Sequence, residues 1–425
     1  MIEKVPLLNT KRDFYLLALL TFFLLFYSLL IEYNNYLHLT KFNSSIIKAK
    51  VVKQYTKTKQ TKKGKIKTYQ VLKLKSPKGF TFYTSLSNKT SQILGKEIKL
   101  EIWMGKISFY EYMSSFYSFS KLLYVYKKTS LKEELQNFIA SQHKDKKITS
   151  IYNALFSASS LTPQLQTQFS SLGISHLIAI SGFHLGVLSA LLFFLIKLPY
   201  KFFQGRYFPY RSYKRDSFII IATLLLSYLL FLDMPPSLLR AYGMLLIGFI
   251  LYDRGVEVVS MQTLFLSVIL LIALFPRLLF SIGFFLSVSG VFYIFLFLLY
   301  FKHISKLWQF LLLPLWVYIC MFPYSLVIFG NFSLYHPLSI LWTSLFTLFY
   351  PLSLVLHLFS LGYLFDPALK WLLHIQLDTL QMELSYGWLG VQVLLSLAAL
   401  YKKSFVIILL LFDLSFFIYA VYYVT

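Results

Sequence analysis

The stretch SHLIAISGFHLGVLSALLFFLIKL, residues 175–198, is long and apolar enough to cross a lipid bilayer. Its first half nevertheless holds polar and small residues, namely His176, Ser181, Gly182 and His184. Polar groups are costly at membrane depth, so they usually face protein or a water-filled cavity. One continuous helix would place both histidines on one face, with Ser181 one step round. We therefore predict a membrane helix with a water-lined or functional face. Helix packing through hydrogen bonds is the alternative interpretation.

The composition of the whole chain indicates a multi-pass membrane protein. Of its 425 residues, 57% are hydrophobic and only 14% are charged, which is not the balance of a soluble globular protein. Apolar runs of about 18 residues recur along the chain, and this length spans the hydrocarbon core of a bilayer. We expect α-helical spans at residues 14–31, 176–198, 217–234, 237–252, 261–275, 278–301, 307–329, 336–362 and 404–424.

Basic residues set the expected orientation of these spans. Lys4, Lys11 and Arg12 precede the first apolar run, and the loop 197–215 carries six lysines and arginines. Because basic loops stay on the cytoplasmic side, the N-terminus and this loop are predicted to be cytoplasmic. No small-residue cleavage site follows the first run, so we interpret residues 14–31 as an anchor rather than a removed signal peptide.

Residues 40–118 combine a β-strand pattern with a strong positive charge. Alternating runs separated by turns predict about five short strands, arranged as a small OB-like barrel inserted on the outer side of the membrane. Between Lys41 and Lys128 there are 20 lysines, no arginine and three glutamates, a net charge of +17. Such a segment attracts nucleic acid, anionic lipid headgroups or an anionic cell-surface polymer. The candidate contacts to DNA are Lys57, Lys59, Lys62, Lys63, Lys65, Lys67, Lys73, Lys75 and Lys78.

Aromatic residues of the same segment are candidates for base stacking: Tyr69, Phe82, Tyr83 and Trp103. Their alternative role is to fill the core of the barrel. Three further segments lie outside the expected spans. Residues 119–172 predict an amphipathic helical linker, residues 364–387 an amphipathic segment along the membrane interface, and residues 388–401 an apolar run too short to span.

A second polar position lies in MPPSLLRAYGMLL, residues 234–246, where Arg240 interrupts an apolar run just after a proline pair. A buried arginine costs at least roughly 2.5–3.5 kcal/mol on insertion scales. It therefore needs a carboxylate, a carbonyl-lined pocket or an anionic substrate, and a local ion pair with Asp233 is the alternative interpretation. In SIGFFLSVSGVF, residues 281–292, the spacing of Gly283 and Ser287 favours close helix packing.

The chain offers little for metal or covalent chemistry. It has one cysteine, Cys320, and its eight histidines have no acidic cluster beside them, so we predict no metal, no cofactor and no catalytic residue. No G-x4-G-K-[ST] loop occurs, so energy for transport has to come from a partner ATPase or from the proton gradient. Ser181 beside a histidine raises the alternative of an intramembrane serine hydrolase. Its Gly-x-Ser-Gly signature is broken, because Ala179 stands at the first glycine.

Three motifs, in order, resemble the ComEC/Rec2 competence family. GISHLIAISGFHLG, residues 173–186, is similar to the family core G-x-x-HLLAISGLH-x-G, and PPSLLRAYGMLL to its P-S-x-x-RA-x-x-M segment. FPRLLFSIGFFLSVSGVF is similar to P-x-x-L-x-x-x-GFQLSF-x-a-x-G, with Phe285 in place of the glutamine. The resemblance covers about residues 150–362. It assigns the channel motif residues His176, Ser181, Gly182, His184, Gly186, Ser237, Arg240, Gly283 and Ser287.

This resemblance implies a channel that moves single-stranded DNA across the bacterial inner membrane during natural transformation. It implies an N-terminal transmembrane helix (1–32), a basic OB-like domain on the periplasmic side (40–118), an amphipathic helical linker (119–172) and a competence-type channel domain (173–425, with the core match at 173–362). The implied partners are single-stranded DNA, a periplasmic DNA-binding competence protein, a cytoplasmic DNA-translocating ATPase, single-strand-binding proteins and the lipid bilayer.

One domain that many members of this family carry is not expected in this chain. Many members carry a metallo-β-lactamase-like domain, but no His-x-His-x-Asp-His occurs here, so we expect a short form without hydrolase activity. Besides the serine hydrolase, the alternative to a DNA channel is an exporter of another polyanion or of a small solute.

Overall fold

The computed structural model describes residues 10–60, 66–87, 93–105, 107–126, 131–255, 258–375, 377 and 379–424. The chain forms two compact units, which are described separately. The β unit comprises Thr10–Glu134 and Ile269–Ser281, and the helical unit includes Leu135–Val268 and Ile282–Thr425. The short segment around residue 275, although distant in sequence, thus belongs to the unit that holds the strands.

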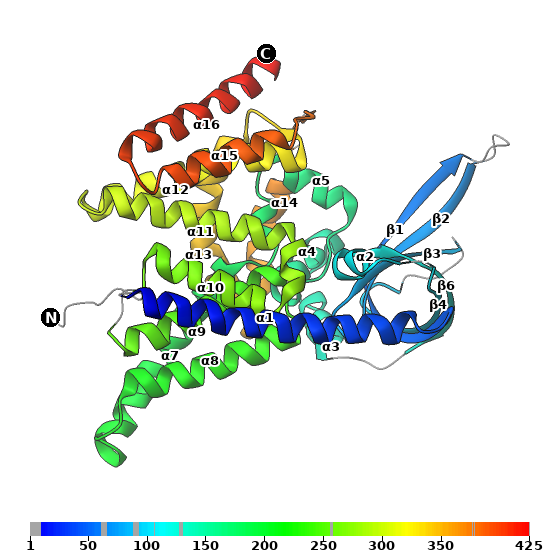
Figure 1. The fold of residues 1–425 in the computed structure, drawn as a ribbon, viewed down its shortest axis with the longest axis horizontal. Helices are drawn as coiled ribbons and strands as arrows, with labels where there is room; N and C mark the ends of the chain where they lie inside the picture. Colours follow the sequence, from blue (N-terminus) through cyan, green and yellow to red (C-terminus); the bar gives the residue numbers. More distant parts are fainter. Residues whose placement is uncertain are drawn as a thin grey trace. The chain divides into compact units, whose positions relative to one another are not determined.

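One six-stranded sheet dominates the β unit, in the order β5-β3-β2-β1-β4-β6 (Figure 1). Its strands are β1 Ser44–Gln60, β2 Ile66–Lys75, β3 Thr81–Ser87, β4 Glu97–Trp103, β5 Phe116–Tyr117 and β6 Phe119–Val125, and α1 Lys11–Thr40, α2 Phe109–Ser114 and η1 Pro276–Phe280 complete the unit. The neighbours pair antiparallel except β3 and β5, which pair parallel.

The sheet curls until strands far apart in its order meet. The hydroxyls of Thr84 in β3 and Ser120 in β6 lie 2.6 Å apart, and the Ser118 N–H donates to the Tyr83 carbonyl at 2.9 Å. Closing a sheet in this way removes exposed strand edges, where other chains could pair.

The structure corrects the prediction that residues 119–172 are helical throughout. Residues 119–125 form β6, antiparallel to β4. The prediction was wrong there because FSKLLYV contains aromatic and β-branched residues that suit a strand, and pairing with β4 gives its backbone groups their partners. The rest of the segment is helical, with α3 Leu131–Ala140, α4 Lys146–Ser157 and α5 Pro163–Ser171.

The alternation in β4 fixes the core of the β unit. Ile98, Leu100 and Ile102 are fully buried while the residues between them are not, as expected of a strand with one face inward. Phe82 is also fully buried, which confirms the interpretation that it fills the core and does not stack on bases. Trp103, at the end of β4, keeps 43% of its surface exposed.

A charged pair ties α1 to η1 within the β unit. The Arg277 guanidinium donates to both carboxylate oxygens of Glu32 at 2.8 Å and lies 4.5 Å from the centre of the Tyr112 ring. Bidentate geometry of this kind is the strong form of an ion pair. Burial raises the pKa of Tyr112 to about 12, so its hydroxyl stays neutral beside the pair.

The helical unit holds the remaining helices. They are α6 Ser175–Ile178, α7 Gly182–Tyr207, α8 Tyr213–Phe231, α9 Pro236–Asp253, α10 Met261–Leu274, α11 Ile282–Phe301, α12 Lys306–Phe329, η2 His336–Leu338, α13 Ser339–Leu358, η3 Gly362–Phe365, α14 Asp366–His374, α15 Gly387–Ala398 and α16 Lys403–Val424. The end of α10 belongs to the β unit. The two-residue strands β7 Asn331–Phe332 and β8 Leu380–Gln381 pair with each other.

Six helices in the described parts of the chain are long and apolar enough to cross a membrane. They are Lys11–Thr40, Gly182–Tyr207, Ile282–Phe301, Lys306–Phe329, His336–Leu358 and Lys403–Tyr423. The expected spans at 217–234, 237–252 and 261–275 form α8, α9 and α10, which are not among these six. The chain is thus a mostly helical, multi-pass membrane protein with a small β-sheet.

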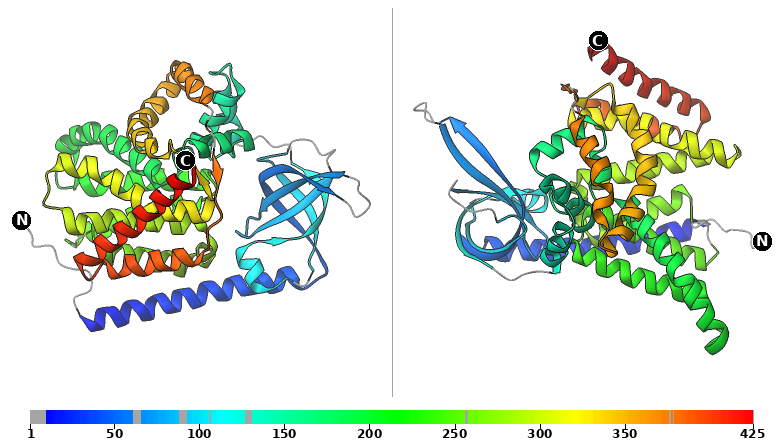
Figure 2. Two further views of the ribbon diagram at one scale, coloured as in Figure 1. Left: turned by 90° about the horizontal axis from the view of Figure 1, so that it is seen from above. Right: turned by 180° about the vertical axis from the view of Figure 1, so that it is seen from behind.

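Helix α13 lies crosswise to α11 and α12, as both views of Figure 2 show. Along its length α13 packs against residues 139–178. At one end His336 contacts the Ser170 carbonyl, in the middle Phe346 and Tyr350 share a core with that segment, and at the other end His357 contacts His143. The opposite face exposes a row of leucines, namely Leu341, Leu345, Leu348 and Leu352. Helix α13 is apolar enough to span a membrane, but within this unit it crosses α11 and α12 and does not pack parallel to them.

Candidate functional site

The predicted continuous helix at 176–198 is broken just before Gly182. Helix α6 ends at Ile178, and α7 begins at Gly182 with Ser181 in an extended conformation as its N-cap. The Ser181 N–H donates to Nδ1 of His184 at 3.2 Å, and the Ser181 hydroxyl lies 3.1 Å from the same nitrogen. Because Ser181 caps the helix instead of continuing it, His176 and His184 do not share one helix face, and that prediction was wrong.

The two histidines instead meet on a shared face of α13. Nε2 of His176 lies 3.5 Å from the Thr343 hydroxyl. The His184 ring packs on Phe346 and Tyr350, with ring centres 5.4 and 4.5 Å apart. Thr343, Phe346 and Tyr350 follow the helical spacing that puts residues on one side. Sequence reasoning missed this role of α13, because the helix carries only ordinary apolar and hydroxyl residues there.

The start of α9 meets the start of α7 and joins the first two sequence motifs. The Ser237 hydroxyl donates to the Ile180 carbonyl at 2.9 Å. A Cβ atom on Gly182 would lie 2.7 Å from Nη2 of Arg240 and 3.0 Å from Cβ of Ala241. Gly182 is therefore the residue that lets the guanidinium reach the backbone where α7 begins.

Arg240 is 5% exposed, and the described contacts give its guanidinium no oxygen acceptor. Its Nη1 donates to the weak acceptor Sδ of Met244 at 3.0 Å, and its Nε has no hydrogen-bond partner in the part of the chain that the structure describes. Among the described contacts of the guanidinium there is none with Asp233, so the local ion pair is not formed there. Nε2 of His184 is likewise buried without a partner within the described ranges. A buried cation with unused donors suits an anion.

The turn that leads into α9 is strained. Asp233 and Met234 both adopt left-handed backbone conformations, with φ of 65° and 54°. Non-glycine residues rarely do so, and such strain gathers at functional sites. The proline pair that follows fixes the start of α9.

We call Ser181, Gly182, His184, Ser237 and Arg240 the motif cluster.

Besides His176, three predicted motif residues lie outside the motif cluster. Gly186 lies on α7, with open space where a Cβ would be, and it lines a groove of about 460 Å³ with residues of α8 and α9. Gly283 and Ser287 lie on α11, exposed and half-buried respectively. Among the described contacts, none brings these two to Arg240 or Ser181.

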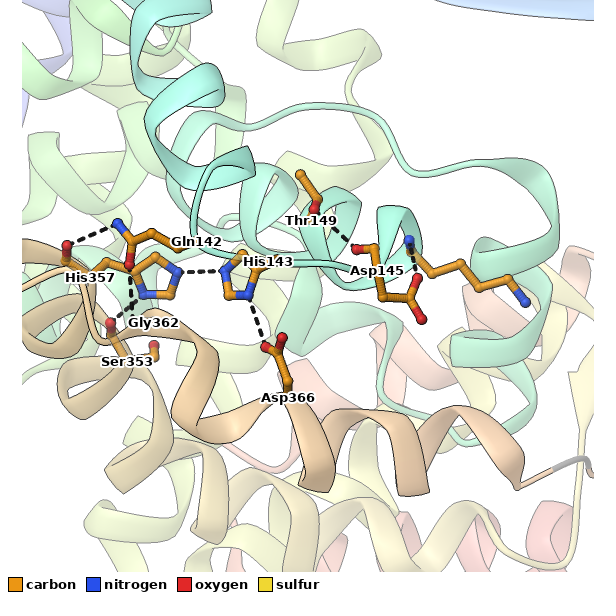
Figure 3. Close-up of polar contacts among 9 residues, drawn as sticks. Gln142, His143, Asp145, Thr149, Ser353, His357, Gly362 and Asp366 are labelled. Atoms are coloured by element: carbon orange, nitrogen blue, oxygen red, sulfur yellow. Dashed lines mark hydrogen bonds and ion pairs between the residues drawn. The ribbon is translucent and has the colours of Figure 1, made fainter.

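A second polar group was not predicted at all (Figure 3). His143, after α3, lies with Nδ1 2.8 Å from a carboxylate oxygen of Asp366 and Nε2 3.0 Å from Nε2 of His357. The Gln142 side chain donates to the His357 carbonyl at 3.1 Å and accepts from the Gly362 N–H at 2.9 Å. These residues lie more than 200 positions apart in sequence, so no local pattern could reveal them. Within the described residues, no group of three or more His, Cys, Asp and Glu side chains is placed to hold a metal.

The described lysines among those predicted to contact DNA lie on β1, on β2 and in the turn that follows β2. Lys57 and Lys78 are exposed, and Lys73 and Lys75 are half-buried. Nζ of Lys73 lies 5.4 Å from the centre of the Tyr83 ring. Lys62, Lys63 and Lys65, and the side chains of Lys59 and Lys67, fall outside the described part of the structure.

Lysines face each other across this sheet. Lys53 is the register partner of Lys73. On the other side of β1, Lys48 pairs with Lys99. Like charges directly opposite each other destabilise a sheet. A bound polyanion would remove this cost.

Comparison with known proteins gives one match. Residues 156–425 match the family described as competence protein. No curated protein and no solved structure matches the chain. Because the family match covers more than half of the 425 residues, the chain belongs to the competence protein family, of the ComEC/Rec2 type that its motifs resemble.

Proposed function

We propose that this protein is the inner-membrane channel through which single-stranded DNA enters the cell during natural transformation. The observation that carries the proposal is the motif cluster, in which a buried Arg240 without a strong acceptor meets the N-terminal end of α7. Both are sources of positive potential, because helix N-termini carry unpaired N–H groups. A phosphate of a passing strand would find donors there but no fixed counter-charge.

The β unit supports the same proposal as a receptor for DNA. Its strand connectivity, with β1 between β2 and β4 and with β3 beside β5, and its curled sheet suit the OB-like barrel that we propose. Facing lysines would release counterions on binding phosphates, and the partly exposed Tyr83 and Trp103 are placed to stack on bases.

The proposal includes an orientation and partners. The N-terminus and the basic loop between α7 and α8 lie on the cytoplasmic side, with the β unit in the periplasm. A periplasmic DNA-binding protein delivers the strand, and a cytoplasmic ATPase with single-strand-binding proteins takes it up. The protein itself carries no catalytic residue and no cofactor in this proposal.

A serine hydrolase is the alternative function that one contact in the motif cluster supports. The Ser181 hydroxyl and Nδ1 of His184 lie within reach of each other. A nucleophile and base of this kind need a third group that orients the base, and Nε2 of His184 has no partner among the described residues. Labelling of Ser181 by a covalent serine probe, abolished by Ser181→Ala, would favour the hydrolase.

Complementation of a deletion strain tests the role of the motif cluster. Arg240→Ala should lower transformation at least tenfold, about the effect of losing 1.4 kcal/mol, while DNA capture outside the inner membrane persists. Arg240→Lys keeps the charge but not the planar fork of donors, so we expect a smaller loss. Gly205→Ala, on the same helix as Gly182 but outside the motifs and with open space where a Cβ would be, is the matched control. Normal transformant numbers for Arg240→Ala, at normal protein levels, would remove the support for the proposal.

A further inference from the structure

His143, His357 and Asp366 form one unbroken line of hydrogen bonds inside the helical unit (Figure 3). The line runs from Asp366 at the start of α14, through both nitrogens of His143, to His357 near the end of α13. It ends where Nδ1 of His357 meets the Ser353 carbonyl at 2.6 Å. The His143 side chain is fully buried, and that of Asp366 is 14% exposed.

Counting hydrogens shows that this line needs one more proton than its neutral histidines and its carboxylate supply. Its three contacts are Asp366 to His143, His143 to His357, and His357 to the Ser353 carbonyl, and each needs one hydrogen between its two atoms. Two neutral imidazoles and a carboxylate supply only two hydrogens. A carbonyl oxygen only accepts, so Nδ1 of His357 must carry one of them. Without a third hydrogen, the one hydrogen of His143 can sit on only one of its two nitrogens. If it sits on Nδ1, two lone pairs face each other between the Nε2 atoms. If it sits on Nε2, no hydrogen lies between His143 and Asp366.

The arrangement of the two rings favours a proton over a metal ion. The ring centres lie 5.1 Å apart and the facing Nε2 atoms 3.0 Å apart. The difference between these two distances is nearly the sum of the two distances from a ring centre to its own Nε2. Both nitrogens therefore lie almost on the line that joins the ring centres. Their lone pairs then point at each other, as in a shared N–H···N bond. A metal ion would need both lone pairs to converge on a point beside that line.

The surroundings leave little room for other ions. The Tyr152 ring of α4 stacks on His143, with ring centres 4.6 Å apart, and lies 4.4 Å from the His357 ring. Burial and the Asp366 carboxylate raise the pKa of Tyr152, so it contributes no charge. A Cβ on Gly362, in η3, would lie 2.6 Å from Nε2 of His357. The backbone therefore closes the remaining side.

Among the described residues, the other charged groups nearby do not reach the line. Next to His143, Lys144 is exposed, and Asp145 accepts from the Lys147 N–H to cap α4. On α14, Lys370 is exposed. From α13 the line is faced by the neutral Ser353, and from the end of α3 by the neutral Gln142 amide. Asp366 is the charge that balances the extra proton.

From this arrangement we propose that Asp366, His143 and His357 form a buried proton-binding site that latches α13 and α14 onto the α3–α4 segment while the proton is bound. Loss of the proton removes one of the three bonds and leaves a buried donor or acceptor unsatisfied, which is costly. Since α13 also carries the face that contacts His176 and His184, the latch couples protonation to the motif cluster. This inference does not depend on DNA being the cargo.

Nitrogen NMR of the full-length protein in bilayers, labelled with ¹⁵N-histidine, tests the site directly. Beside the signals of exposed histidines such as His374, we expect an imidazolium signal that disappears as the pH rises and is absent in both His143→Gln and His357→Gln. His374→Gln is the matched control, since His374 is exposed on α14 and bonds only a backbone carbonyl in the described contacts. Two neutral histidines at every pH would overturn the proposal. So would a spectrum that changes on adding EDTA or zinc, because that would indicate a metal site.

Hydrogen exchange at one fixed pH tests the latch. Asp366→Asn keeps the shape of the side chain but removes the charge that balances the proton. We expect exchange of the amides at the end of α13, residues 353–362, to become several-fold faster in this variant and to stay unchanged in His374→Gln. Equal exchange in Asp366→Asn and the wild type would contradict the latch. Because the wild-type NMR spectrum needs no variant, a variant that fails to fold does not leave the proton site untested.

Discussion

At the scale of single residues, one glycine decides whether the motif cluster can form. Gly182 gives the Arg240 guanidinium the space that a methyl group would occupy, with Nη2 only 2.7 Å from that position. Nη2 is the far end of a long side chain and can swing aside, whereas the Cβ of Ala241, 3.0 Å from the same position, requires a small shift between α7 and α9. The cost to stability should therefore be limited. The position of the guanidinium, however, would change.

We therefore predict that Gly182→Ala lowers transformation far more than it lowers stability. The measurements are transformant counts in a complemented deletion strain and the Tm of the purified protein. Gly205→Ala, near the other end of α7 and also with open space where a Cβ would be, should lower neither. A large fall in Tm for Gly182→Ala would mean that the glycine serves packing alone.

At a second glycine, Gly330, we expect a substitution to affect mainly the stability of the protein. Gly330 ends α12 with φ of 68°, and a Cβ there would lie 2.7 Å from the backbone oxygen of Met382. A backbone atom cannot step aside as a side chain can, and left-handed φ disfavours other residues. Gly330→Ala should cost roughly 1–3 kcal/mol. The Tm checks this, with Gly390→Ala in α15, where a Cβ meets nothing within 4 Å, as the control. Equal Tm values for both variants would contradict the prediction.

At the scale of elements, the ion pair between Glu32 and Arg277 should stabilise the β unit. The two side chains are 16% and 17% exposed. Removing one partner of a largely buried pair strands the other charge, at a cost of about 3–5 kcal/mol when burial is complete and less here. Glu32→Gln should therefore lower the protein level and the Tm.

The control for this prediction is an exposed pair of the same kind. Arg215 and Asp253 lie 3.4 Å apart with 61% and 42% of their side chains exposed, and pairs of this type contribute little. Asp253→Asn should leave the Tm unchanged. If the two variants lowered the Tm equally, burial would not be the cause of the stabilisation.

Individual helices and strands show which parts of the structure could be predicted from the sequence. The long apolar runs predicted α1, α7, α11, α12 and α16 because one run makes one helix. The alternation at Ile98, Leu100 and Ile102 predicted β4 and its buried face. The break at Ser181 was missed, because an N-cap serine inside an apolar run has the same composition as a continuous span. The pairing of His143 with His357 and Asp366 was missed because only tertiary packing brings them together.

At the scale of the whole molecule, the positive charge is concentrated in the β unit and should govern binding. We predict that the full-length protein binds single-stranded DNA with an affinity that falls steeply with salt. Replacing Lys53, Lys57 and Lys78 by Gln should reduce the slope of log K against log salt by about 2, at about 0.7 per lost phosphate contact. Because Lys53 faces Lys73, the same change should not destabilise the sheet.

The matched control replaces three exposed lysines of the helical unit, Lys302, Lys306 and Lys402, with the same loss of charge. An equal reduction in slope for both triple variants would mean that net charge, and not the hairpin, attracts the strand. A slope near zero for the wild type would contradict phosphate binding altogether.

The most direct measurement of the central claim follows fluorescent DNA in a strain that lacks this gene. Capture of DNA in the periplasm and its arrival in the cytosol are recorded separately, with and without the restored gene. The account predicts normal capture, no cytosolic arrival, and recovery with the wild-type gene but not with Arg240→Ala. Normal arrival in the deletion strain would contradict it, and the family motifs would then serve another cargo.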